Sequence, residues 1–183
     1  MKFINKHNIN ELGHRKVYKL TLSALFIAMG TLTGSLLYIP FLGGKMFPVQ
    51  HFLNVLGGVL LGPYYGFLNA VSISLLRNIM GTGSILAFPG SIFGALLAGL
   101  FYKKFKNIYL AALGEVIGTG VIGAILAYPL ATIVMGKEAA VFAFVFPFSL
   151  SCIGGAILAL ILLKIPMIER IFLQMGFFPP YEG

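Results

Sequence analysis

The sequence contains no tryptophan and no aspartate, and only 10% of its 183 residues are charged. So few charges argue against an ordinary soluble domain, whose surface carries many charged side chains. The single cysteine, Cys152, excludes an intrachain disulfide, and its apolar neighbours favour a packing role. The net charge of +8 does not indicate nucleic-acid binding, because the basic residues form short clusters between apolar runs.

Motifs for nucleotide binding and catalysis are also missing. The chain has no Gly-x-x-x-x-Gly-Lys-Ser/Thr loop, so it cannot drive transport with ATP by itself. Neither His-Glu-x-x-His nor Gly-x-Ser-x-Gly occurs, and three histidines and one cysteine offer few metal ligands or nucleophiles. The sequence therefore predicts a protein that is not an enzyme and that holds no metal or other cofactor.

Apolar runs dominate what is present, with 58% hydrophobic residues and a mean hydropathy of +0.95. Several of these runs approach the roughly 20 residues that cross a bilayer as a helix. We therefore expect an all-α integral membrane protein with six transmembrane helices in one bundle. The expected spans are residues 17–39, 49–61, 64–79, 87–102, 108–135 and 141–163.

These spans divide the chain into a basic arm at residues 1–16, a transmembrane domain at 17–163 and a tail at 164–183. The first span is too long for the apolar part of a signal peptide, and no small-x-small cleavage site follows it. We therefore expect it to be retained as a membrane helix.

The stretch from residue 49 to 79 allows either one long tilted helix or two short ones. With two helices, every basic residue except Lys45, Arg77 and Lys137 lies on the same side of the membrane as the N-terminal arm. With one helix, the cluster at residues 103–106 and the tail would not both share that side. The positive-inside rule therefore favours six spans with both termini in the cytoplasm, and Gly62-Pro63 suits a tight turn between the two helices.

Arg77 and Asn78 end the third expected span at the outer surface, and the turn Gly81-Thr82-Gly83-Ser84 follows them. A glycine-rich polar connection of this kind is tolerated at membrane depth where it lines a cavity. Arg77 can contribute to a ligand site there. It can equally snorkel to the interface or cap its own helix.

Glu115 lies inside the fifth expected span, where an acidic side chain is costly and normally faces the bundle interior. It can contact a ligand or ion, or form a structural hydrogen bond with Thr119 one turn later. His51 opens the second span near the outer surface, and it too suits either a ligand contact or a structural role.

Small residues recur at helical spacing in three of the expected spans, which allows close helix approach in lipid. Packing between helices of this chain is the simplest explanation for any one stripe, but with three stripes we expect one to face another protein. The stripes are Ala24, Ala28, Thr31 and Ser35; Gly90, Gly94 and Ala98; and Gly114 and Gly118.

Six spans with both ends inside, no motor motif and the Ala24-x-x-x-Ala28 pair together resemble the substrate-binding (S) components of energy-coupling factor (ECF) vitamin transporters. The chain more closely resembles the ThiW type, the S component assigned to the thiazole precursor of thiamin. The resemblance covers most of the chain and is strongest from residue 57 to 102. The segments that carry it are Leu60-Leu61-Gly62-Pro63-Tyr64-Tyr65, Leu76-Arg77-Asn78, Gly81-Thr82-Gly83-Ser84 and Leu86-Ala87-Phe88-Pro89-Gly90-Ser91-Ile92-Phe93-Gly94-Ala95-Leu96-Leu97-Ala98-Gly99.

This resemblance implies a cell-membrane protein that captures hydroxyethylthiazole or a related thiamin precursor from outside. Delivery would require docking on a transmembrane coupling protein and two cytoplasmic ATPases, with Ala24 and Ala28 facing the coupling protein. The absence of tryptophan departs from the thiamin-binding S components, where aromatic stacking is prominent, and argues against whole thiamin as the ligand.

The implied pocket lies in the outer half of the bundle, under the loop at residues 40–48. A small heteroaromatic ring with a hydroxyl needs apolar walls and a few fixed polar groups. Phe88 and Tyr128 can supply the walls, and the polar groups can come from His51, Arg77, Asn78, Ser84 and Glu115.

A competing hypothesis is a small oligomeric channel, or a proton- or cation-coupled carrier, in which Glu115 binds the ion. Experiments can distinguish an S component from such a channel or carrier. An S component binds its ligand as a monomer and co-purifies with an ATPase module, whereas a channel oligomerises and conducts without ATP.

Overall fold

The computed structural model describes residues 6–41, 44–136, 138, 140, 142–168 and 170, and it is mostly helical. Lys2, Lys137 and the tail beyond Arg170 lie outside the described residues. The α-helices are α1 (Lys6–Leu36), α2 (Pro48–Leu56), α3 (Pro63–Ile79), α4 (Ala87–Phe105), α5 (Ile108–Glu115), α6 (Ala124–Pro129) and α7 (Val145–Leu163). Three π-helical stretches are η1 (Gly57–Leu61), η2 (Val116–Gly123) and η3 (Leu130–Val134).

Several of these pieces join end to end. The stretch η1 continues α2, and the pieces α5, η2, α6 and η3 form one apolar helix from Ile108 to Val134. Pro129 contributes to the irregular winding, because it lacks the N–H that an α-helical hydrogen bond requires there. In the described part of the chain, these helices overlap the six stretches that the sequence predicts as spans.

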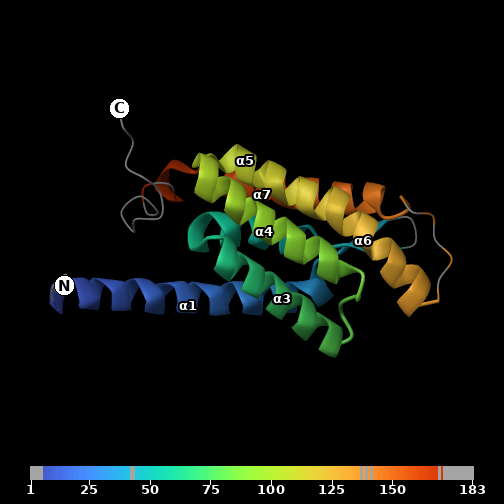
Figure 1. The fold of residues 1–183 in the computed structure, drawn as a ribbon, viewed down its shortest axis with the longest axis horizontal. Coiled ribbons are helices and arrows are strands. Elements are labelled where there is room, and N and C mark those ends of the chain that lie inside the picture. Colours follow the sequence, from blue (N-terminus) through green and yellow to red (C-terminus); the bar gives the residue numbers. More distant parts are fainter. Residues whose placement is uncertain are drawn as a thin grey trace, which may run out of the picture.

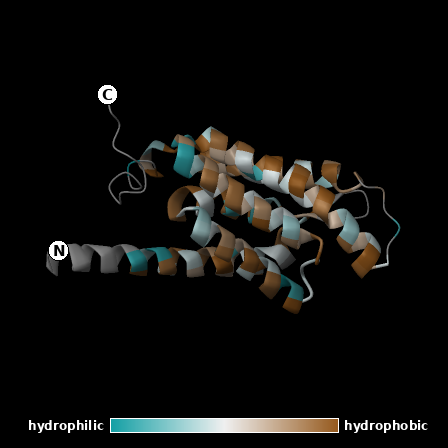
Figure 2. Cartoon of the chain, viewed as in Figure 1, coloured by the Kyte–Doolittle hydropathy of each residue, from teal (hydrophilic) through white to brown (hydrophobic). Residues whose placement is uncertain are grey.

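Three of the joined helices in the described residues are long and apolar enough to cross a membrane: Lys16–Gly34, Ile108–Val134 and Val145–Leu163. Large apolar side chains also stay on the outside, such as Ile133 at 82% exposure and Phe142 at 70%. Figure 2 shows hydrophobic residues along the length of the helices, a composition suited to lipid. The structure thus supports a membrane protein, while six crossings and cytoplasmic termini stay predictions.

The break at Gly62-Pro63 is confirmed. Gly62 has a φ of 91°, which a residue with a Cβ rarely adopts, and Pro63 occupies the first turn of α3, where its missing N–H costs nothing. The region from residue 49 to 79 is therefore two helices.

Three predicted boundaries are wrong by several residues. Helix α1 begins at Lys6, within the predicted basic arm, and the predicted loop at residues 40–48 contains the antiparallel strands β1 (Ile39–Phe41) and β2 (Gly44–Met46). Helix α7 begins at Val145 rather than near residue 141, and its first turn contains Pro147, which is tolerated there. Hydropathy located the apolar stretches but not the local hydrogen bonding that ends each helix.

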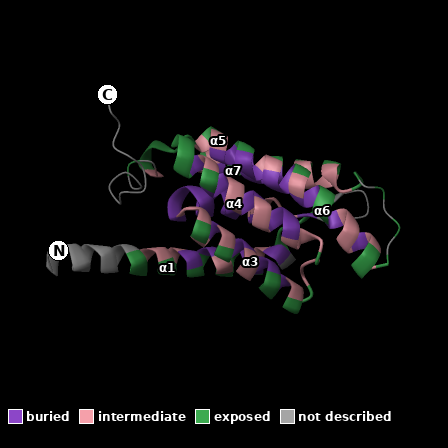
Figure 3. Ribbon diagram, in the orientation of Figure 1, coloured by how far each residue is buried: buried purple, intermediate pink, exposed green. Residues whose placement is uncertain are grey.

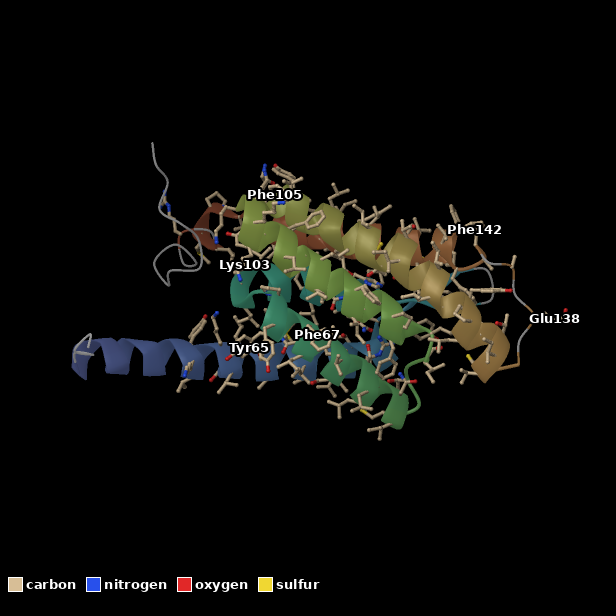
Figure 4. The ribbon with its side chains drawn as sticks, in the orientation of Figure 1. Tyr65, Phe67, Lys103, Phe105, Glu138 and Phe142 are labelled. Atoms are coloured by element: carbon tan, nitrogen blue, oxygen red, sulfur yellow. The ribbon has the colours of Figure 1, made fainter. Side chains whose placement is uncertain are left out.

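The helices run back and forth along one direction (Figure 1). The start of α1, the connection between α4 and α5 and the end of α7 lie at one end of the molecule. Lys103 and Phe105 lie at that end in Figure 4, opposite Glu138 and Phe142.

The end that includes Lys103 also pairs lysines with aromatic rings. Lys164 Nζ lies 4.9 Å from the centre of the Tyr109 ring, and Lys19 Nζ lies 5.5 Å from that of Tyr65. Lysines over aromatic rings are typical of a membrane–water interface. This geometry matches the clustering of positive charge that the sequence places on one side.

Helix α4 packs closely on α5 and η2 through the two glycine stripes. A Cβ on Gly114 would lie 2.7 Å from the Leu97 carbonyl oxygen, and one on Gly118 would lie 2.7 Å from the Gly94 Cα. Both distances are shorter than real Cβ contacts, so only glycine permits this approach. These two stripes serve packing within the bundle, and Figure 3 shows buried residues concentrated there.

Candidate ligand-binding site

Helix α2 carries a polar face into the middle of the bundle. Gln50 and Asn54 are one turn apart, and both are buried, at 4% and 3% exposure. His51 lies beside them and is only slightly exposed. Polar groups in an apolar interior need hydrogen-bond partners, and α3, α4 and α5 supply them.

Arg77, in the last turn of α3, is 2% exposed. Its Nη1 donates to Gln50 Oε1, and its Nη2 donates to the Thr82 carbonyl at 3.2 Å. The Phe47 ring covers the guanidinium, with 3.9 Å from Cζ to the ring centre. The predicted alternative in which Arg77 snorkels to the interface is wrong, because its charged end points into the bundle rather than toward water.

A chain of hydrogen bonds leads from Arg77 to Glu115. Gln50 Nε2 donates to Ser74 Oγ at 3.1 Å and to Ser91 Oγ at 2.8 Å. Asn54 Nδ2 donates to the Ser91 carbonyl at 3.3 Å and to Glu115 Oε1 at 3.1 Å. We call the connected side chains the polar cluster: Gln50, His51, Asn54, Ser74, Arg77, Ser91, Glu115 and Thr119.

Glu115 is fully buried at the end of α5, with 0% exposure. Besides Asn54, its Oε1 is in contact with His51 Nδ1 at 2.8 Å and with Thr119 Oγ1 at 2.9 Å. The bond to Thr119 is the structural contact that the sequence allows beside a ligand contact. Glu115 Oε2 lies against Gly94, where a Cβ would collide with the carboxylate, and no described residue bonds to it.

The polar cluster contains one arginine and one carboxylate, joined through neutral amides and hydroxyls rather than by direct contact. Burying such groups in a membrane bundle is costly, and they mark functional sites more often than not. Among the described residues, Arg77 Nε and Glu115 Oε2 have no partner. The cluster thus retains hydrogen-bonding capacity that the described part of the chain does not use.

The predicted residues fall into two groups. His51, Arg77 and Glu115 meet in the polar cluster. Asn78 instead donates to the Ser74 and Ser84 carbonyls at 2.8 and 3.3 Å, which holds the turn after α3.

Ser84 also belongs to that turn, since its hydroxyl accepts from the Leu86 N–H at 3.2 Å. Phe88 in α4 and Tyr128 in α6 are half-buried, and neither is a member of the polar cluster. For these three residues a ligand contact stays a prediction.

Sequence reasoning missed Gln50, Asn54, Ser74 and Ser91. The one signal available was Gln50-x-x-x-Asn54, two amides on one face of a short apolar helix. Such a pair in lipid requires partners, but the sequence does not say which helices provide them.

Ala24 and Ala28 are exposed on α1. The opposite face of the helix packs on α3, where a Cβ on Gly30 would lie 2.6 Å from Ile73 Cδ1 and one on Gly34 would collide with Arg77. The alanine pair is therefore not used for packing within the described residues. Thr31, predicted in the same stripe, is buried, so the stripe does not form one continuous exposed surface.

The comparisons with known proteins agree with the sequence-based resemblance. A family model described as thiamine-precursor transporter protein (ThiW) matches residues 20–168. No curated protein and no solved structure matches the chain.

Proposed function

The chain belongs to the ThiW family of thiamine-precursor transporter proteins, and we propose that it is the substrate-capture (S) component of an ECF importer. Family membership establishes transport of a thiamine precursor as its task, which is not an enzymatic one. The family match over residues 20–168 is the observation that carries the proposal.

Hydroxyethylthiazole is the precursor that we propose as ligand. It combines a small apolar ring with one hydroxyl and suits a site of few polar groups within an apolar bundle. The polar cluster supports this choice, because it places a few buried polar side chains within an apolar bundle.

The proposed pocket lies next to the polar cluster, under the hairpin that joins α1 to α2. Phe47, just after β2, stacks on Arg77, and its N–H donates to Ser151 Oγ of α7 at 3.1 Å. Displacing this segment would uncover the cluster from the hairpin end. We propose this route for entry from the outside, with His51, Arg77 and Glu115 as the central polar residues.

Transport also needs an energy source, and the chain has no nucleotide-binding motif of its own. We propose that a membrane coupling protein and two cytoplasmic ATPases supply it. The exposed pair Ala24 and Ala28 would form the contact, since small side chains allow a partner helix to approach closely. We also propose that the protein is a multi-pass subunit of the cell membrane.

The proposal is tested in two steps. Purified protein titrated calorimetrically with hydroxyethylthiazole should bind it as a monomer. Cells that express the chain with its ATPase module should take up the labelled thiazole, and cells without the module should not. Robust uptake driven by a proton or sodium gradient alone would instead support the carrier that uses Glu115.

A further inference from the structure

The contact with Glu115 indicates which ring nitrogen of His51 carries the proton. Asn54 Nδ2 carries only donor hydrogens, so Glu115 Oε1 accepts from it. The same oxygen lies 2.8 Å from His51 Nδ1. Because an accepting oxygen is best paired with an N–H, we assign the ring proton of His51 to Nδ1. With the proton on Nδ1, the His51 ring offers a lone pair at Nε2.

His51 is also the accessible member of this group. Its side chain is 12% exposed and that of Glu115 is 0% exposed, with Oε2 lying against Gly94. The ring edge with Nε2 faces away from the carboxylate, and no described residue bonds to that nitrogen. His51 is therefore the more exposed of the two side chains.

We propose that His51 Nε2 accepts a hydrogen bond from a hydroxyl of the ligand, with Glu115 as the positioning residue that fixes the ring. This inference rests on the proposed function and adds the chemical class that the site selects: a free alcohol. An ether of the same skeleton has no proton to donate. A phosphate ester adds acceptor oxygens and a charge of about −2 beside another acceptor and a buried carboxylate.

The first test compares three ligands on the wild-type protein by calorimetry: hydroxyethylthiazole, its O-methyl ether and its phosphate. We expect the ether to bind at least about tenfold more weakly and the phosphate not to bind detectably, because an unpaired buried acceptor remains. Equal affinity for the alcohol and the ether overturns the inference. Failure to bind any of the three overturns the proposed function instead.

The second test uses His51→Phe, which keeps an aromatic ring but removes the acceptor. The ratio of the dissociation constant of the ether to that of the alcohol should fall to about one. The control His14→Phe, in the N-terminal part of α1, should keep the wild-type ratio. If His51→Phe binds the alcohol with undiminished preference, His51 is not the acceptor. If it does not fold, the ligand comparison on the wild type still decides.

The role of Glu115 has a spectroscopic readout. Nitrogen NMR of histidine-labelled protein should show His51 protonated at Nδ1 and unprotonated at Nε2. In Glu115→Gln a neutral amide faces the ring, so the Nδ1-protonated fraction should fall and the preference for alcohol should fall with it. A proton on Nε2 in the wild type contradicts the proposal whatever the affinities are, because that nitrogen would then be a donor.

Discussion

The alanine pair on α1 and the glycine stripes on α4 and α5–η2 share one sequence spacing but have opposite surroundings. Gly114 and Gly118 pack against α4 inside the bundle, where a single Cβ would collide with backbone atoms. Ala24 and Ala28 are exposed on a helix that touches the rest of the molecule mainly through α3 (Figure 3). Small residues at helical spacing thus indicate a close approach without saying whether the neighbour belongs to the same chain.

The largest expected effect comes from adding bulk to the buried stripe. Gly118→Leu places a Cβ 2.7 Å from the Gly94 Cα and 2.5 Å from the Phe93 carbonyl oxygen, neither of which is a flexible side-chain end. We expect a loss of at least about 3 kcal/mol, which leaves little folded protein. The fraction of monodisperse protein in detergent and its thermal midpoint measure this. The control, Ala28→Leu, should have the thermal midpoint of the wild type. A normal midpoint for Gly118→Leu would show that the glycine stripe is not closely packed.

Adding bulk to the exposed stripe should abolish uptake without disturbing the fold. In the double variant Ala24→Leu and Ala28→Leu, we expect unchanged stability and ligand affinity but at least about tenfold slower ATP-dependent uptake, because a partner helix can no longer approach. Ala143→Leu adds bulk at an exposed position near the opposite end of the molecule and should transport normally. Normal uptake in the double variant would remove the docking assignment.

A smaller effect on stability distinguishes the turn after α3, which Asn78 holds, from the polar cluster. Asn78→Ala deprives the Ser74 and Ser84 carbonyls of their side-chain donor, so we expect about 1–2 kcal/mol lower stability. Affinity for hydroxyethylthiazole should change less than stability. A large loss of affinity at unchanged thermal midpoint would show instead that Asn78 contacts the ligand.

The smallest expected effect tests one hydrogen bond of the buried region. Thr119→Val preserves shape but removes the hydroxyl that lies 2.9 Å from both Glu115 Oε1 and the Gly90 carbonyl. We expect a loss of about 1 kcal/mol, or about fivefold in ligand affinity. Thr132→Val is the matched control, since that hydroxyl bonds to the Tyr128 carbonyl one turn earlier and to no other described residue. Equal effects of the two substitutions in calorimetry would remove Thr119 from the site.

Much of the fold could be predicted because a membrane helix is specified by a run of consecutive apolar residues. Apolar runs located the helices, and Gly62-Pro63 located the break between η1 and α3, since each depends on residues close in sequence. The hairpin β1–β2 and the start of α1 at Lys6 were not predicted, because backbone hydrogen bonding rather than hydropathy defines them.

Only His51, Arg77, Glu115 and the Thr119 contact of the polar cluster could be predicted from the sequence. Arg77 and Glu115 stood out because a charge in an apolar run is costly and needs a reason. Gln50, Asn54 and Ser91 did not stand out, since neutral amides and hydroxyls are less unusual in a membrane helix. Asn78 and Ser84 stood out through their glycine-rich surroundings, yet they hold a turn.

The sequence alone determined the membrane class, the lack of a motor and the family resemblance, since composition and contiguous motifs carry all three. Only the tertiary structure decided which small-residue stripe is buried and which side chains complete the polar cluster. Gln50 of α2, Arg77 of α3, Ser91 of α4 and Glu115 of α5 meet because four helices converge at one depth. A local sequence pattern does not identify the neighbour of a helix face. Periodicity gives the face on which a side chain lies, but not which helix packs against that face.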